Sequence, residues 1–168
     1  MVSLLEEAGL PAGTINVING SGGVTGAALA ASPNIDRIAF TGGGATARQV
    51  MAAACEHLTP VHFELGGKSC NIVFDDANFE RAVDGSLVNI FSNSGQICIA
   101  GSRILVQRGI AERFIDAFVA RTRSLIIGSP LDPTTEVGPM AFKAHQQRVL
   151  DHIARATSEG ATLLCGGE

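Results

Sequence analysis

Residues 37–65 read RIAFTGGGATARQVMAAACEHLTPVHFEL and contain the clearest secondary-structure pattern of the chain. A short apolar run at 37–40 leads through three glycines into an amphipathic stretch that reaches residue 54, and a second apolar run follows at 61–65. Apolar runs of about four residues that alternate with amphipathic stretches of about ten or more are typical of βα units around a parallel sheet. These residues therefore predict a strand, a helix and a second parallel strand.

The same alternation continues on both sides of this unit. It predicts strands at 15–18, 71–74, 103–107 and 161–165, and helices at 2–8, 24–31, 79–91, 111–126 and 142–159. We interpret the chain as α/β, with βα units around a parallel sheet. Because the first helix is short and the last strand has nothing behind it, we expect the chain to be a piece of a larger protein.

Length and composition narrow the function classes. The chain has 168 residues, a net charge of −4 and a hydrophobic fraction of 46%, so it can bury a core and is not disordered. It has no basic excess, no Trp and no Tyr, which disfavours nucleic-acid binding. No apolar run reaches the roughly 18 residues of a membrane span, and the N-terminus has no secretory signal pattern. We expect a cytoplasmic protein.

The cysteines and histidines form no metal-binding pattern. The four cysteines, at 55, 70, 98 and 165, include no C-x-x-C pair, and the four histidines do not complete a zinc spacing. We therefore predict no metal site, and we expect reduced thiols, as in other cytoplasmic proteins.

The first segment that could carry chemistry is the glycine-rich turn after residue 40. The apolar run passes through Thr41, Gly42 and Gly43 into a helix start. Backbone N–H groups at a helix N-terminus can bind phosphate, although glycines also occur in such turns only because the turn is tight. The segment is neither GxGxxG nor a P-loop, so these residues allow both interpretations.

The second segment places Glu64 at the end of the apolar run 61–65. Ligands bind at strand ends in open α/β sheets, where a partly desolvated carboxylate can act as a general base. The alternative is a glutamate that pairs with a nearby lysine or is solvated.

The third segment is the small-residue loop that contains Cys98, between the predicted helix 79–91 and the predicted strand 103–107. Loops between rigid elements often carry function, and a thiolate is a strong nucleophile near neutral pH. A purely structural thiol is the alternative.

Together, the three segments resemble the aldehyde dehydrogenase superfamily. They are FTG at 40–42, ELGGKS at 64–69 and GQIC at 95–98, with Cys98 standing 34 positions after Glu64. The flanking segments GLPAG at 9–13, NIVF at 71–74 and EVGP at 136–139 agree. The resemblance covers essentially the whole chain but only a central part of the family's longer chain. It implies a partial Rossmann-like cofactor domain at 1–66 followed by the start of an α/β catalytic domain with a parallel sheet at 67–168.

The resemblance implies NAD(P)-dependent oxidation of a small-molecule aldehyde to a carboxylic acid. In the family, the cysteine that matches Cys98 attacks the carbonyl carbon to give a thiohemiacetal, hydride passes to the nicotinamide, and water hydrolyses the thioester that remains. Glu64 matches the general base that activates this water and can help to deprotonate the thiol. Its presence disfavours, by resemblance, the branches that pass the acyl group to coenzyme A.

The cofactor implied by the resemblance is NAD or NADP. Gly20, Thr41, Gly42 and Gly43 match positions that line the family's dinucleotide cleft, and Leu65 matches a backbone contact near the nicotinamide. Gly43 stands where the family usually has Ser, which removes a hydroxyl contact to the pyrophosphate and keeps the backbone donor.

Two other functions remain open at this point. One is a catalytically silent nucleotide-binding or interaction module left by truncation of an enzyme gene. The other is a cysteine hydrolase that pairs Cys98 with a histidine, although no histidine spacing suggests such a dyad. The family implies a homo-oligomeric parent enzyme, and we expect the 168-residue piece to be inactive in isolation.

Overall fold

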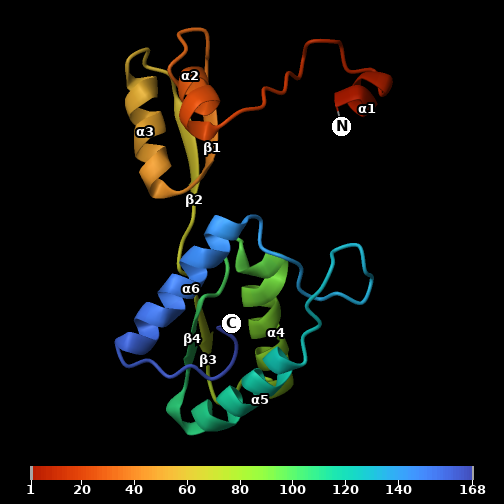
Figure 1. Cartoon of the computed structure of the whole chain (residues 1–168), viewed down its shortest axis with the longest axis vertical. Coiled ribbons are helices and arrows are strands. Elements are labelled where there is room, and N and C mark those ends of the chain that lie inside the picture. The colour runs from red at the N-terminus through yellow and green to blue at the C-terminus, as the bar shows by residue number, and fades with distance from the viewer. Residues whose placement is uncertain (1, 168) are drawn as a thin grey trace. The chain divides into compact units, whose positions relative to one another are not determined.

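Two pairs of parallel strands organise the chain, one in each of two structural units (Figure 1). The computed structural model describes residues 2–167. The first unit ends at Leu65 and the second begins at Gly66. Mixed helices and parallel strands confirm the predicted α/β class.

In the first unit, β1 (Ile38–Gly42) pairs in parallel with β2 (Val61–Leu65), and α3 (Gly44–Cys55) connects them. The remaining elements are α1 (Val2–Glu7), a π-helical turn η1 (Gly22–Gly26) and α2 (Ala27–Ala30). Helix α3 packs against both strands and against α2. Its buried positions are alanines, so the backbones of helix and sheet can approach closely.

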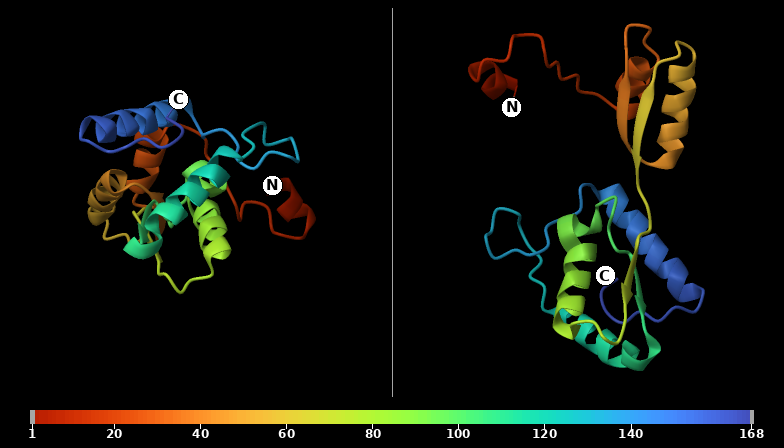
Figure 2. Two further views of the ribbon diagram at one scale, coloured as in Figure 1. Left: turned by 90° about the horizontal axis from the view of Figure 1, so that it is seen from below. Right: turned by 180° about the vertical axis from the view of Figure 1, so that it is seen from behind.

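In the second unit, β3 (Cys70–Val73) pairs in parallel with β4 (Arg103–Val106). Helix α4 (Phe79–Phe91) and the turn η2 (Ser92–Gly95) precede β4. A short turn η3 (Arg108–Ile110) and two helices, α5 (Ala111–Arg123) and α6 (Lys143–Ser158), follow it. Figure 2 shows from behind how α4 and α5 lie beside each other next to this strand pair.

The core of the second unit lies between α4, α5 and the strands. Val73, Val83, Leu87 and Phe114 are buried together. The ring of Phe114 stacks on that of Phe118 with centroids 6.0 Å apart. Burying an aromatic or large aliphatic side chain contributes about 1.5–3 kcal/mol, so this cluster fixes how α4 packs on α5.

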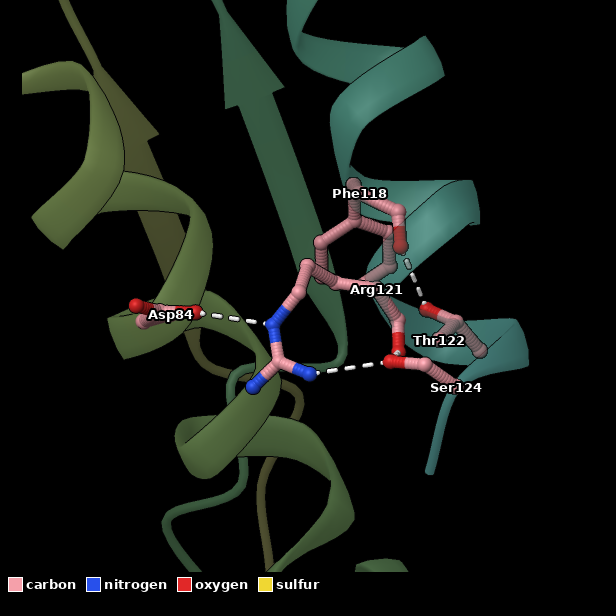
Figure 3. A network of polar contacts seen from close by, with 5 residues as sticks. All are labelled: Asp84, Phe118, Arg121, Thr122 and Ser124. Carbon is pink, nitrogen blue, oxygen red and sulfur yellow. Dashed lines mark hydrogen bonds and ion pairs between the residues drawn. The ribbon is translucent and has the colours of Figure 1, made fainter. Parts of the chain in front are cut away.

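Polar contacts at the surface join the same two helices. Arg121 Nε donates to Asp84 Oδ1 at 3.3 Å, and Arg121 Nη1 donates to Ser124 Oγ at 2.9 Å (Figure 3). The Arg121 and Asp84 side chains are 49% and 61% exposed. Exposed ion pairs contribute at most about 1 kcal/mol, so the pair supports a packing arrangement that the apolar core sets.

The start of α4 follows a standard capping rule. Asn78 precedes the helix with an extended backbone, and its Oδ1 accepts a hydrogen bond from the Arg81 backbone N–H at 3.1 Å. Such a cap satisfies one of the N–H groups that a helix leaves unpaired at its start. The predicted bounds of 79–91 for this helix are therefore confirmed.

Two predicted strands are wrong. Residues 15–18 and 161–165 are irregular in the structure. An apolar run permits a strand, but the strand forms only where a neighbour takes up its backbone hydrogen bonds. In the part of the chain that the structure describes, β1 pairs with β2 and β3 pairs with β4, so neither segment has a strand partner.

None of the helices within residues 2–167 combines the length and the apolar character that crossing a membrane requires.

Candidate active site

One face of the β1–β2 pair brings two of the predicted site residues side by side. In the parallel register Thr41 lies opposite Glu64, and Ala39 lies opposite His62. Side chains alternate between the faces of a strand, so these four residues share one face. The pairing sets a hydroxyl beside a carboxylate at the carboxyl ends of both strands, which is the edge where ligands bind in α/β sheets.

Glu64 has a polar partner that the sequence did not suggest. Its Oε1 lies 3.0 Å from Nε2 of His62, and both side chains are 69% exposed. The sequence allowed a partly desolvated base, a lysine partner or a solvated side chain; at 69% exposure the carboxylate is largely solvated, and its side-chain partner is a histidine. Residues two apart on a strand point to the same face, and this spacing was the signal that could have identified His62.

The predicted phosphate-binding turn is open to an approaching anion. Gly43 precedes α3 with φ −81° and ψ 149° and makes no side-chain cap. The first hydrogen bond of the helix runs from the Ala47 N–H to the Gly43 carbonyl at 3.0 Å. A Cβ at Gly43 or Gly44 would meet no atom within 4 Å. Within residues 2–167, the start of α3 therefore has no side-chain cap, and Gly43 and Gly44 are exposed.

Gly42 and Gly20 are glycines for packing reasons. A Cβ at Gly42 would lie 2.6 Å from the ring of Phe40, and one at Gly20 would overlap the Thr25 side chain. At these two positions a neighbouring side chain lies against the glycine backbone, so glycine is favoured there whether or not the position binds a ligand. Gly43 differs, because space around it remains free.

A cavity of about 620 Å³ lies in the first unit between η1, α2, β1 and α3. Small residues of η1 and α2, such as Gly22, Gly23 and Ala27, line one wall, and Thr46 and Gln49 of α3 line another. None of these lining residues is a site residue predicted from the sequence. Thr46 and Gln49 are three apart on α3 and therefore share a helix face, and this spacing is the signal by which the sequence indicates them.

In the second unit, Cys98 lies in the turn between η2 and β4, and its side chain is exposed. The turn is closed by a hydrogen bond from the Ala100 N–H to the Ile97 carbonyl at 3.1 Å. The chain reaches this turn through Asn93 and Ser94, whose φ angles are 51° and 57°. A left-handed backbone conformation raises the free energy by about 1–2 kcal/mol for a residue other than glycine. Contacts with other residues must therefore stabilise this conformation at Asn93 and Ser94.

Two of those contacts come from the segment after α5, and a third comes from α4. Ser94 Oγ donates to the Gly138 carbonyl oxygen at 2.8 Å, and the Ala141 N–H donates to Gln96 Oε1 at 3.1 Å. On the other side of the turn, the Gly101 N–H donates to Asn89 Oδ1 at 3.2 Å. These bonds fix the backbone around Cys98 and leave its thiol free.

A backbone hydrogen bond links the two sequence motifs. The Gly67 N–H donates to the Cys98 carbonyl oxygen at 3.3 Å. Gly67 belongs to the ELGGK segment and Cys98 to the GQIC segment, and the bond lies within the second unit. The stretch that follows Glu64 is therefore attached to the turn that carries the thiol.

Comparison with known proteins places these features in one family. The model of the Aldehyde dehydrogenase family matches residues 1–168. A betaine aldehyde dehydrogenase of Brucella anthropi is 46% identical over 162 residues, which are 96% of this chain and 33% of that protein.

Solved structures agree. A betaine aldehyde dehydrogenase from Staphylococcus aureus in complex with NAD+ has a TM-score of 0.95 at 41% identity, over 99% of this chain and 33% of that chain. PnpE in complex with nicotinamide adenine dinucleotide has a TM-score of 0.97 at 44% identity, over 99% of this chain and 34% of that chain. The chain thus spans about a third of the length of the proteins that it matches.

Proposed function

The chain belongs to the aldehyde dehydrogenase family, and we propose that it is the part of such an enzyme that carries the nucleophile, the hydrolytic base and part of the NAD site. The reaction is oxidation of a small aldehyde to a carboxylic acid, and betaine aldehyde, for which relatives are named, is a candidate substrate. The hydrogen bond between Gly67 and Cys98 is the observation that carries the proposal, because it joins the two catalytic motifs.

Cys98 acts as the nucleophile. Its exposed thiol lies in a turn whose backbone is held on both sides, so an aldehyde can reach the sulfur while the main chain stays fixed. Attack forms a bond between the sulfur and the carbonyl carbon, and the negative charge develops on the oxygen. The backbone N–H of Cys98 is suited to stabilise this oxygen.

Glu64 acts as the base for hydrolysis of the thioester. Gly67 follows Glu64 by three residues, so the covalent chain alone keeps their Cα atoms within roughly 11 Å. Glu64 takes a proton from water as the water oxygen bonds to the thioester carbon. The carbon–sulfur bond then breaks, the acid leaves, and the Cys98 thiolate is restored.

The residues of the first unit fit a bound dinucleotide. The uncapped N–H groups at the start of α3 suit a pyrophosphate, and the cavity between α2 and α3 offers small residues for an adenosine group. Thr41 and Leu65 lie at the sheet edge beside Glu64, where they would contact the nicotinamide end of the dinucleotide. When bound, NAD supplies the hydride acceptor. On this interpretation, residues 2–65 belong to the cofactor domain and 66–167 to the catalytic domain.

The proposal is tested on the full-length protein, meaning the whole enzyme to which these 168 residues are proposed to belong. It is titrated with NAD and then with an aldehyde while reduced-cofactor fluorescence is recorded. We expect saturable NAD binding and, on addition of aldehyde, a steady increase in fluorescence. NAD binding without turnover would contradict the proposal and would support a silent binding module. Absence of both signals would overturn it as well.

Gly43→Ser tests the cofactor site separately. The position has free space for a side chain, and a serine hydroxyl there can contact the pyrophosphate and also cap α3. We expect the Kd for NAD to fall about two- to tenfold, which is the range for one added hydrogen bond. Calorimetric titration measures the change, with Gly43→Ala as the matched control that adds a Cβ without the hydroxyl. Equal affinities for the two variants would contradict the pyrophosphate assignment.

A further inference from the structure

We propose that His62 is a positioning residue for Glu64. It holds one carboxylate oxygen, so that the other oxygen remains free to take the proton of the hydrolytic water. This role of His62 rests on the proposed role of Glu64 as the base for hydrolysis.

The geometry supports a direct contact. His62 Nε2 and Glu64 Oε1 are 3.0 Å apart, within hydrogen-bond distance. An ionised carboxylate can only accept hydrogen bonds, so the proton of this bond belongs to Nε2 and the imidazole is the donor. A hydrogen bond to a charged acceptor is stronger than one between neutral groups.

The neighbouring residues on β1 carry no charge that could orient the Glu64 carboxylate in place of His62. On the neighbouring strand Ala39 lies opposite His62, and its methyl group leaves room for an imidazole. Thr41, opposite Glu64, is uncharged. Within residues 2–167, Glu64 forms one side-chain hydrogen bond, and its partner is His62.

The bond has a kinetic consequence. A glutamate side chain has three rotatable torsions, and an exposed one samples many rotamers. A donor on Oε1 restricts these rotamers and keeps the lone pairs of Oε2 available. During hydrolysis the proton of water moves to Oε2, the water oxygen bonds to the acyl carbon, and the carbon–sulfur bond breaks. Attack by the thiolate of Cys98 transfers no proton to Oε2, so loss of His62 is expected to lower the rate of deacylation and to leave the rate of that attack unchanged.

The contact between His62 and Glu64 is expected to contribute little to the free energy of unfolding. Both side chains are 69% exposed, and exposed pairs of this kind contribute little to the free energy of unfolding. Removal of the imidazole should therefore leave the folded unit intact and change the rate of one chemical step.

The test uses the full-length protein and p-nitrophenyl acetate without NAD. Acylation of the Cys98 sulfur releases p-nitrophenolate in a burst, and hydrolysis of the acetyl thioester sets the steady rate that follows. In His62→Ala we expect an unchanged burst and a steady rate about three- to tenfold lower, as for loss of one hydrogen bond. Acetylated Cys98 should accumulate accordingly in the mass spectrum of the quenched protein.

Two further variants separate positioning from structure. His62→Gln keeps an N–H donor at the position of Nε2, so it should restore most of the steady rate. His57→Gln alters an exposed histidine in the turn after α3, so it should behave as the unmodified protein.

The outcomes are distinct. An equal decrease of burst and steady rate in His62→Ala, or no change in either, would overturn the positioning role. Absence of a burst in the unmodified protein, or a burst that survives Cys98→Ala, would refute the proposed function itself. A burst that needs Cys98 and a steady rate that falls in Glu64→Gln, but not in His62→Ala, would refute only the role of His62.

Discussion

Cys98→Ala is expected to abolish aldehyde oxidation by the full-length protein, with kcat/KM lowered at least about 10⁴-fold. The sulfur forms the covalent bond to the carbonyl carbon, and alanine offers no atom that can replace it. Because the Cys98 side chain is exposed, alanine leaves no cavity in a core, and the free energy of unfolding should stay within about 0.5 kcal/mol of the unmodified value. NADH formation at saturating aldehyde measures the effect.

The chain provides a matched control for this variant. Cys70 is also an exposed free thiol of the second unit, at the start of β3. Cys70→Ala should retain the activity. Iodoacetamide should inactivate the unmodified protein and Cys70→Ala by modification of Cys98. Substantial dehydrogenase activity in Cys98→Ala, or its loss in Cys70→Ala, would contradict the assignment of the nucleophile.

Glu64→Gln is expected to slow hydrolysis of the thioester by a factor of about 10²–10⁴, the range for loss of a general base. Glutamine has nearly the same shape but cannot take the proton from water. The hydride step does not need that proton transfer, so stopped-flow recording should show a burst of NADH followed by a slow steady rate. The acyl group should be found on Cys98 when the reaction is quenched during the slow phase.

Glu56→Gln serves as the control for Glu64→Gln. Glu56 follows α3 in the same unit and is exposed, and nothing in the proposed mechanism involves it. Its kinetics should equal those of the unmodified protein. An unaltered steady rate in Glu64→Gln, with no accumulated thioester, would mean that another group activates the water.

Local sequence patterns predicted most of the fold. The strand at 61–65 and the helix at 79–91 have the predicted bounds, because an apolar run and a helical period act within a few residues. The Asn78 cap of this helix was found only in the structure. The strands predicted at 15–18 and 161–165 are irregular, because pairing depends on a neighbouring strand, which no local pattern specifies. The family resemblance read from the three motifs is confirmed by the match over the whole chain.

The chemical groups of the candidate site, namely one thiol, one carboxylate and one glycine-rich helix start, could be identified from residue types and their spacings alone. The contacts that these groups make depend on the folded chain. The register of β1 on β2 sets Thr41 beside Glu64, and a backbone hydrogen bond attaches Gly67 to the turn of Cys98. Each of these contacts joins residues more than 20 positions apart in the chain. Periodicity and propensity describe only near neighbours, so such contacts exist only once the chain has folded.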